Sequence, residues 1–347
     1  MYMWVDGLVE EAKRRAKASA QLSSSEMAVL ALARNTLPGC SLRARSALQG
    51  RGCSLLRSAL PGRGCALLSA RRLLQQAPQK QGDWSKMAKL YAENRGTFQQ
   101  AYAHDCWDEV TSRPAVAPIV ARATRVLDVG SGTGTFAAAL DATLPAATVA
   151  GVDLSADMVD FARKAYPALT FAVADLSDAP ADLDVGGDFD VATSTMVLHW
   201  PGPNVAFLEG VRRLLAPGGV FVAGLHGAGS CQEGVDAIEA AARADGRDLE
   251  LDALPTMFRR DDAALWEAAL AEAGFSDVDV RTRTVVTEYA SVGDAAKRLA
   301  AAWPPILSGV APDDEVPALI DAAARAMCDA DGHGVMTSHL IEFSAHN

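Results

Sequence analysis

The sequence predicts an α/β protein with a doubly wound, mostly parallel sheet of seven strands, an antiparallel edge strand and a helical cap insertion. Three observations support this prediction. Short apolar runs alternate with segments of helical spacing from Asp83 onward, a glycine-rich loop follows the first run, and two long strand candidates close the chain. Strands separated by helices require right-handed crossovers, which produce a parallel sheet covered on both faces.

Charge and composition separate a leader from the body of the chain. Residues 1–80 hold 13 Lys/Arg against four Asp/Glu, whereas the remainder holds 19 against 39. The leader, residues 1–82, contains a near-repeat in which SALQGRGCSLLR is followed at once by SALPGRGCALLS. Its composition fits a mitochondrial or plastid transit peptide, and it fits equally a low-complexity, disordered extension. The expected location is therefore intracellular, either cytoplasmic or organellar.

Residues 83–347 are expected to form one domain with four parts. Residues 83–120 show helical spacing and predict pre-core helices, and residues 121–290 hold the alternating core. Residues 291–331 resemble two helices between two strand candidates, so they predict a lid folded over one end of the sheet, and residues 332–347 supply the terminal strand.

Each element of the core follows from its local pattern. Apolar, β-branched runs predict buried strands, and segments with apolar residues at helical spacing predict the helices between them. Ser155 fits the N-cap of the second core helix. Gly218 and Gly219 end the third, over 204–219. The strand candidates are 126–130, 148–153, 171–176, 189–196, 220–227, 278–290 and 335–345, and the helix candidates are 135–143, 155–166, 204–219 and 261–275.

Composition also excludes several classes of partner. An acidic body argues against nucleic acid, because phosphate neutralisation needs Lys and Arg on a contiguous face. The six cysteines form no CxxC pair, and no spacing typical of zinc occurs, so no metal site is predicted. No apolar run reaches the roughly 18 residues of a membrane span. A small-molecule substrate remains as the expected partner, and the oligomeric state stays undetermined.

The glycine loop Gly130-Ser131-Gly132-Thr133-Gly134 follows the first strand, where open parallel sheets bind ligands. A P-loop is excluded because no Gly-Lys-Ser/Thr follows. A dinucleotide fingerprint would need glycine at position 135, which is Thr135. Asp128 precedes the loop, and its carboxylate would repel a pyrophosphate. The loop therefore favours a cation.

Further acids follow the next two strands. Asp153 could accept hydrogen bonds from both ribose hydroxyls of a nucleoside, and Asp175 could accept from the exocyclic amine of adenine. Together with the loop, these acids describe a site for an adenosine with a cationic, phosphate-free tail, which is the chemistry of S-adenosyl-L-methionine. Apolar flanks for the purine are offered by Leu154, Met158 and Leu176.

Five motifs in register resemble the class I S-adenosylmethionine-dependent methyltransferases, in particular the small-molecule group with ubiquinone/menaquinone, trans-aconitate and malonyl-carrier-protein methyltransferases. They are VLDVGSGTG, GVDLSADMV, ADL, FDVATSTMVLHW and LLAPGG. The resemblance implies a Rossmann-like methyltransferase fold. It places Asp128, Gly130, Gly132 and Gly134 at the methionine part of the cofactor, Asp153 at the ribose and Asp175 at the adenine.

The resemblance also implies roles around the transferred methyl group. FDVATSTMVLHW places Ser194 among the cofactor contacts and His199 beside the methyl group as a candidate general base. The segment WSKMAKLY is similar to a pre-core motif whose aromatic residue, here Tyr91, closes over the cofactor. Trp200 and His226 are the candidate substrate contacts.

The expected activity is in-line O-, N- or S-methylation of a small molecule, with S-adenosyl-L-homocysteine as product. Two alternatives stay open: an NAD(P)-dependent oxidoreductase, which shares the glycine loop and Asp153, and a methyltransferase-fold binding protein without turnover. The acidic body and the absence of an Asn-Pro-Pro-Tyr-like tetrapeptide weigh against modification of nucleic-acid bases.

Overall fold

A computed structural model describes residues 98–178, 183–246, 262–303, 307, 311–312 and 314–347. The leader and Tyr91 lie outside the described residues. The chain divides into two compact units, and the sheet belongs to the one formed by Pro78–Ala263 and Ala269–Asn347. The other unit is Met1–Ala77 with Ala264–Ala268, of which only the last five residues are described.

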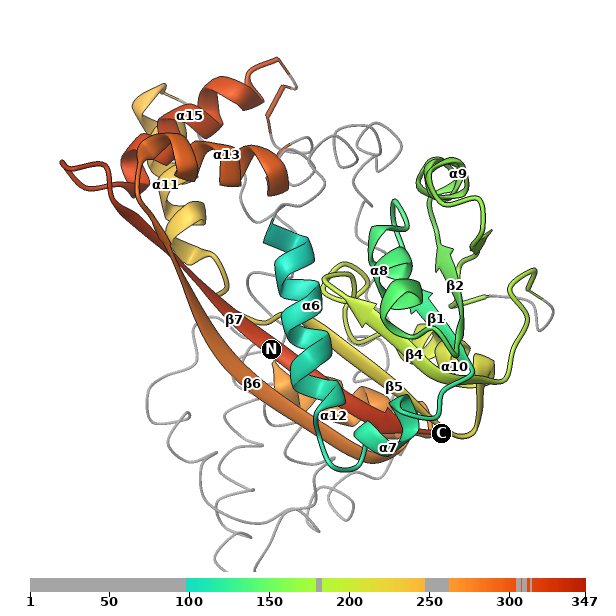
Figure 1. Ribbon diagram of the computed structural model, residues 1–347. Coiled ribbons are helices and arrows are strands. Elements are labelled where there is room, and N and C mark those ends of the chain that lie inside the picture. Colours follow the sequence, from blue (N-terminus) through green and yellow to red (C-terminus); the bar gives the residue numbers. More distant parts are fainter. Residues whose placement is uncertain (1–97, 179–182, 247–261, 304–306, 308–310, 313) are drawn as a thin grey trace, which may run out of the picture. The chain divides into compact units, whose positions relative to one another are not determined.

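A seven-stranded sheet in the order β3-β2-β1-β4-β5-β7-β6 organises the described chain (Figure 1). The first five strands pair in parallel, and β7 runs antiparallel to both of its neighbours, β5 and β6. This confirms the predicted sheet with its antiparallel edge pair. The strands are β1 (Arg125–Val129), β2 (Thr148–Asp153), β3 (Thr170–Val173), β4 (Phe189–Thr195), β5 (Leu215–His226), β6 (Ser276–Tyr289) and β7 (Gly334–His346).

Alternation along the strands distributes their side chains between the two faces of the sheet. Val220 and Val222 of β5 belong to the core that the helices on one face complete, while the Phe221 ring between them contacts Phe275 and Phe343. The helices that join Val220 and Val222 in this core are α6 (Phe98–Thr111), α7 (Ala117–Val120), α8 (Thr135–Thr143) and α9 (Ala156–Ala165).

Helix α9 begins as the sequence predicts, because the Ser155 hydroxyl accepts a hydrogen bond from the Met158 amide. Helix α10 (Val205–Leu214) is capped in the same way by Asn204, whose side chain accepts from Phe207. Helix α12 (Ala263–Glu272) precedes β6. None of the described helices combines the length and the apolar character that a membrane crossing requires.

The cap is a separate helical cluster with its own apolar core. Figure 1 shows α13 (Val292–Ala302) and α15 (Val316–Met327), the two predicted lid helices, together with α11 (Gln232–Ala244) where β6 ends and β7 begins. Helix α11 was not predicted. A Cβ on Gly234 of α11 would lie 2.9 Å from the Trp303 ring, so the helices approach too closely for a side chain there. The core of the cap includes Ile238, Leu299, Trp303, Leu319 and Ile320.

Several predicted boundaries differ from the structure. The strand expected at 171–176 ends at Val173, so Asp175 lies in the loop that follows. The strand expected to begin at Val220 begins at Leu215, because Leu215 already pairs with Phe189 of β4 before the register shifts. The helix expected over 204–219 therefore ends at Leu214, and Gly218 and Gly219 lie in β5.

One helix and two strands meet at an ion pair whose carboxylate is buried. Arg283 of β6 binds Glu342 of β7 at 2.6 Å and Asp105 of α6 at 2.7 Å, and the Glu342 side chain is 2% exposed. The Glu342 hydrogen bond is the main cause that raises the pKa of Arg283. Nearby Cys106 has its thiol pKa raised by burial and then by Glu342. The buried Glu342 carboxylate depends on Arg283, because water cannot reach the carboxylate to solvate its charge in place of the cation.

We expect Arg283→Met to lower the free energy of unfolding by about 3–5 kcal/mol, because it leaves Glu342 buried without its cation. Arg281→Met on the same strand is the matched control. It removes an exposed pair with Asp279 and should cost under about 1 kcal/mol. Urea unfolding of both variants measures the difference, and equal losses would contradict a special role for the buried pair.

Candidate functional site

The carboxyl ends of the parallel strands meet at one edge of the sheet and bring the predicted site residues together. Asp128 lies near the end of β1 and pairs with Gly151 of β2 and Thr193 of β4. Asp153 ends β2, and His226 ends β5. This is the edge at which open parallel sheets bind ligands.

The glycine loop adopts the left-handed backbone that its three glycines permit. Gly130, Gly132 and Gly134 have φ values of 74°, 52° and 77°, which disfavour residues with a Cβ. The amides of Gly130 and Ser131 donate to the Val152 carbonyl at 2.8 and 3.0 Å. These bonds tie the loop to β2.

The three glycines differ in what surrounds them. A Cβ on Gly130 would lie 2.5 Å from Val197, and one on Gly134 would lie 2.8 Å from Phe171, so close packing requires glycine at both positions. A Cβ on Gly132 would have nothing within 4 Å. Gly132 therefore presents bare backbone to open space, where a ligand can approach it.

Asp128 is a buried carboxylate with one oxygen left over. It is 2% exposed, and its Oδ2 has no hydrogen-bond partner among the described residues. Burial raises its pKa to about 7, and the charge of Asp153 adds to this increase. A neighbouring cation would favour the ionised form of this carboxylate and would lower its pKa.

Asp153 is held by the loop that it faces. Its Oδ2 accepts from the Gly132 amide at 2.8 Å and its Oδ1 from the Ser155 amide at 2.9 Å. Burial raises its pKa, and these backbone hydrogen bonds oppose that change. A carboxylate has about four acceptor positions, so each oxygen retains capacity for a further donor such as a hydroxyl.

The predicted adenine contacts follow β2 and β3: Leu154, Asp175 and Leu176 lie in the loops, and Met158 lies in the first turn of α9. Leu154 is 43% exposed and Met158 is buried, so only Leu154 presents much apolar surface. Asp175 is exposed and its Oδ1 accepts from the Ser177 amide at 2.9 Å. Leu176 is buried, and its carbonyl lies where a Cβ on Gly210 would fall.

Ser194, a predicted cofactor contact, is engaged by the backbone of β1. The Ser194 hydroxyl is fully buried and donates to the Val129 carbonyl at 2.9 Å, which joins β4 to the end of β1. Tyr91 lies outside the described residues.

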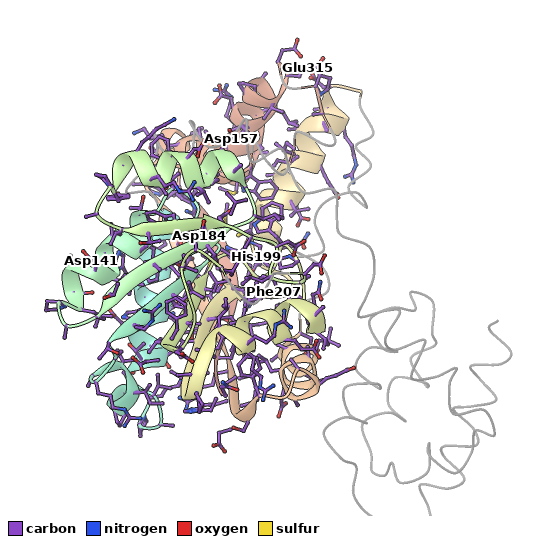
Figure 2. The ribbon with its side chains drawn as sticks, turned by 90° about the vertical axis from the view of Figure 1, so that its right-hand side faces the viewer. Asp141, Asp157, Asp184, His199, Phe207 and Glu315 are labelled. Carbon is purple, nitrogen blue, oxygen red and sulfur yellow. The ribbon has the colours of Figure 1, made fainter. Side chains whose placement is uncertain are left out.

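His199, Trp200 and His226 come together after β4 and at the end of β5. The His199 ring centroid lies 5.7 Å from that of Trp200 and 5.4 Å from that of His226. Figure 2 shows His199 in the interior, whereas Asp141 and Asp157 lie on the outer helices α8 and α9. Trp200 is half-buried and packs against the core of the cap.

Both imidazoles are buried and each keeps an Nδ1 without a hydrogen-bond partner in the described part of the chain. Burial lowers the pKa of His199 well below its usual value, and His226 lowers it further. Burial also lowers the pKa of His226 to about 4, with Arg298 as the second cause. Both rings are therefore neutral near pH 7, and a neutral ring can accept a proton.

Two residues that the sequence analysis missed complete this region. Tyr102 of α6 contacts the His226 ring edge to face, with centroids 6.1 Å apart, and donates to Ser338 of β7 at 3.0 Å. The Arg298 guanidinium of α13 lies 5.9 Å from the centre of the Tyr102 ring. The only available signal for Arg298 was its position beside Leu299, on the border of the buried face of an amphipathic helix.

Fold and site together define a Rossmann-like α/β protein with a ligand site at the strand ends, formed by a glycine loop and two acids. Residues 126–219 match the family model of the methyltransferase domain. This range includes all five motifs, and the match confirms the resemblance that they predict.

The comparisons with individual proteins cover only part of the chain. It is 30% identical over 199 residues to the malonyl-[acyl-carrier protein] O-methyltransferase of Alcanivorax borkumensis. This alignment covers 56% of this chain and 62% of that protein. It is 35% identical over 100 residues to the trans-aconitate 2-methyltransferase of Paracidovorax citrulli, 28% of this chain and 37% of that one. The chain thus spans less than two thirds of these relatives.

Among solved structures, phosphoethanolamine N-methyltransferase 2 of Haemonchus contortus, in complex with S-adenosylhomocysteine, aligns with a TM-score of 0.41 at 15% identity. The alignment covers 74% of this chain and 59% of that one.

The raised pKa of Asp128 makes stability depend on pH. Its folded pKa lies above the usual value of 3.8, so its protonated form stabilises the fold at low pH, and this contribution is lost as pH rises through about 7. As the pH rises from 5.5 to 8, the free energy of unfolding of Asp128→Asn should therefore increase by about 2 kcal/mol relative to that of the parent. Urea unfolding at several pH values measures this.

Asp141→Asn is the control, because this exposed carboxylate on α8 is solvated in the folded and the unfolded chain. A stability difference between Asp128→Asn and the parent that stays constant from pH 5.5 to 8 would contradict the assignment.

Proposed function

We propose that this protein is an S-adenosyl-L-methionine-dependent methyltransferase that acts on a small-molecule acceptor. The observation that carries this proposal is the buried Asp128 carboxylate, with Oδ2 unsatisfied in the described chain, together with the open backbone of Gly132 in the loop that follows it. An unsatisfied buried anion suits a cationic ligand, and bare backbone suits a close approach. The match of residues 126–219 to the methyltransferase domain supports the same conclusion.

The residues present fit this cofactor. Asp128 would face its cationic methionine part, Gly130, Gly132 and Gly134 would border it, and the spare acceptor positions of Asp153 would bind the ribose hydroxyls. Leu154 and Met158, with Leu176, would flank the adenine, and Asp175 would accept from its amine. Bound there, the cofactor supplies a methyl group on a positively charged sulfur, which makes that methyl electrophilic.

Catalysis then rests mainly on positioning. An in-line transfer needs the accepting atom aligned with the methyl group and water excluded, which at its limit contributes about 7–11 kcal/mol. The cap helices and Trp200 would exclude water, and Tyr102 with His226 would border the acceptor. The neutral His199 would accept the proton of a hydroxyl or protonated nucleophile, a contribution of about 10²–10⁴-fold in rate.

Isothermal titration calorimetry with S-adenosylmethionine, S-adenosylhomocysteine and NADH tests the cofactor assignment. We expect saturable binding of the first two ligands and none of NADH. Gly132→Ala should weaken binding at least tenfold, because a methyl group would occupy the open face of the loop. Strain at φ 52° should cost the fold only about 1–2 kcal/mol.

Gly187→Ala is the matched control, since a Cβ at Gly187 also meets open space but its backbone lies outside the positive-φ region. It should leave affinity unchanged. Saturation by NADH, with no heat from either nucleoside, would instead favour the oxidoreductase.

His199→Gln should slow methyl transfer at least 100-fold and leave cofactor affinity within about twofold, because the ring would act on the acceptor's proton. The measurement is the initial rate of label transfer from methyl-labelled S-adenosylmethionine into the small-molecule fraction of a cell extract. His104→Gln is the control, as His104 is exposed on α6 and contacts Phe136. Equal rates in both variants would remove His199 from the chemistry, and cofactor binding without any label transfer by the parent would indicate a binding protein.

A further inference from the structure

The two buried histidines at the strand ends form a pair, and the proposed function uses only one of the two rings as a base. His199 follows β4 and His226 ends β5, and these strands pair in parallel up to Thr195 and Gly224. The ring centres of the two histidines lie 5.4 Å apart, with the rings tilted by 59°. The role inferred for His226 rests on the proposed function, because it concerns the orientation of the candidate base.

The backbone holds the turn that carries His199 against the strand that carries His226. The chain leaves β4 at Met196 with a φ of 57°, which is uncommon for a residue with a Cβ. A costly conformation of this kind persists where the surrounding structure requires it. The Met196 amide donates to the Gly224 carbonyl at 2.8 Å, so the turn stays bonded to β5.

The same nitrogen is left over in both rings. Nδ1 of His199 and Nδ1 of His226 are buried and lack a hydrogen-bond partner among the described residues. Buried polar atoms are nearly always paired, so two such atoms on neighbouring rings need an explanation. Ring centres 5.4 Å apart leave about 3 Å between ring atoms that face each other, which is the length of a hydrogen bond. The ring torsion of histidine is soft, so rotation about the Cβ–Cγ bonds can turn the two nitrogens toward each other.

The charge state of the pair suits a hydrogen bond between the rings. Burial lowers both pKa values, and the charge of His226 lowers that of His199 further, so the pair resists taking up two protons. The Arg298 guanidinium is the second cause that lowers the pKa of His226. Both rings are therefore neutral near pH 7. A neutral imidazole has one donor and one acceptor nitrogen, so one Nδ1 can donate to the other.

Tyr102 holds the His226 ring in place. Its ring meets that of His226 edge to face, with centres 6.1 Å apart, and its hydroxyl donates to Ser338 of β7 at 3.0 Å. The same hydroxyl lies 3.4 Å from that of Thr287 on β6. A residue that orients a base must itself be fixed by packing and hydrogen bonds of this kind.

We propose that His226 is a positioning residue whose Nδ1 accepts a hydrogen bond from Nδ1–H of His199, which leaves Nε2 of His199 bare to take the acceptor's proton. The nitrogen of a histidine that carries the proton is set by the hydrogen bond that the other nitrogen makes. Activated bases are commonly oriented by a third group in this way. Here a neutral imidazole takes the place of a carboxylate, and a neutral group is less costly to bury.

The step that the pair serves is removal of the acceptor's proton. The acceptor atom forms its bond to the methyl carbon with its own electron pair, and the pair of the broken carbon–sulfur bond stays on the sulfur. The acceptor's proton goes to Nε2 of His199 and passes to water when the product leaves. His226 makes no covalent bond in this step, and its Nδ1 stabilises the imidazolium that His199 becomes.

NMR of the full chain with ¹⁵N-labelled histidine at pH 7 tests the pair in the free protein. His199→Gln and His226→Asn assign the two residues among the six histidines. We expect Nδ1 of His199 to be protonated and Nδ1 of His226 to be bare, with a ¹⁵N–¹⁵N scalar coupling between them across the hydrogen bond. A bare Nδ1 on His199 in the parent would contradict the inference.

Two replacements at position 226 separate positioning from packing. His226→Leu removes the acceptor, so the proton of His199 should move to Nε2 and the initial rate of label transfer should fall about tenfold or more. His226→Asn places a carbonyl oxygen near the position of Nδ1, so it should keep the proton of His199 on Nδ1 and most of the rate. His339→Leu is the control, because His339 is exposed on β7 and its Nδ1 lies 3.2 Å from the Thr284 hydroxyl.

A His199 proton that stays on Nδ1 in His226→Leu, or an equal rate in this variant and the parent, would overturn the inference. A thermal melt shows whether each variant is folded, and the coupling in the parent decides the question without any variant. S-adenosylhomocysteine binding is measured in the same samples. Cofactor binding by a parent whose His199 carries its proton on Nε2 refutes the positioning role alone, whereas a parent that binds no cofactor refutes the proposed function.

Discussion

The rest of the structure depends on the burial of two neighbouring carboxylates, Asp128 and Asp153, at the carboxyl ends of the strands. Asp128 lies near the end of β1 and Asp153 ends the adjacent parallel strand β2, and both are largely withdrawn from water. Burial raises both pKa values, and the charge of Asp153 raises that of Asp128 further, which costs the free protein stability near neutral pH. A positively charged ligand would stabilise the ionised carboxylates and would bind more tightly because of them. The arrangement therefore suits a sulfonium nucleoside.

The scaffold holds these acids by backbone rather than by side chains. The loop amides bind the carbonyl and carboxylate that end β2, and close contacts with Val197 and Phe171 leave no space for a Cβ at Gly130 or Gly134. Gly132 alone faces open space among the three. The cap is different in character, because it is a second apolar core that brings a cation toward the histidines. Cofactor and acceptor would thus be held by parts of the fold that can vary separately.

Much of this fold could be predicted from the sequence because its signals are local. Alternating apolar runs located every strand, and Ser155 marked the start of α9. The glycine loop and Asp128 could be placed at the strand ends because parallel strands share one edge. Tyr102 and Arg298 could not be predicted, since nearly 200 residues of sequence separate them and only packing of α13 near α6 brings them together. Helix α11 was not predicted, although its apolar residues have helical spacing. The hydrogen bond from Ser194 to the backbone of β1 depends on strand pairing, which the local sequence does not show.

The most direct test of the account is the proton released when S-adenosylmethionine binds. Calorimetry near pH 7 in two buffers of different ionisation enthalpy counts that proton, and comparison with Asp128→Asn subtracts any released by the ligand's own amino group. Because Asp128, with its pKa of about 7, must ionise to meet the cation, the parent should release about half a proton more than the variant. Equal proton counts, with equal affinities, would show that Asp128 does not sense the charge of the ligand and would contradict the account.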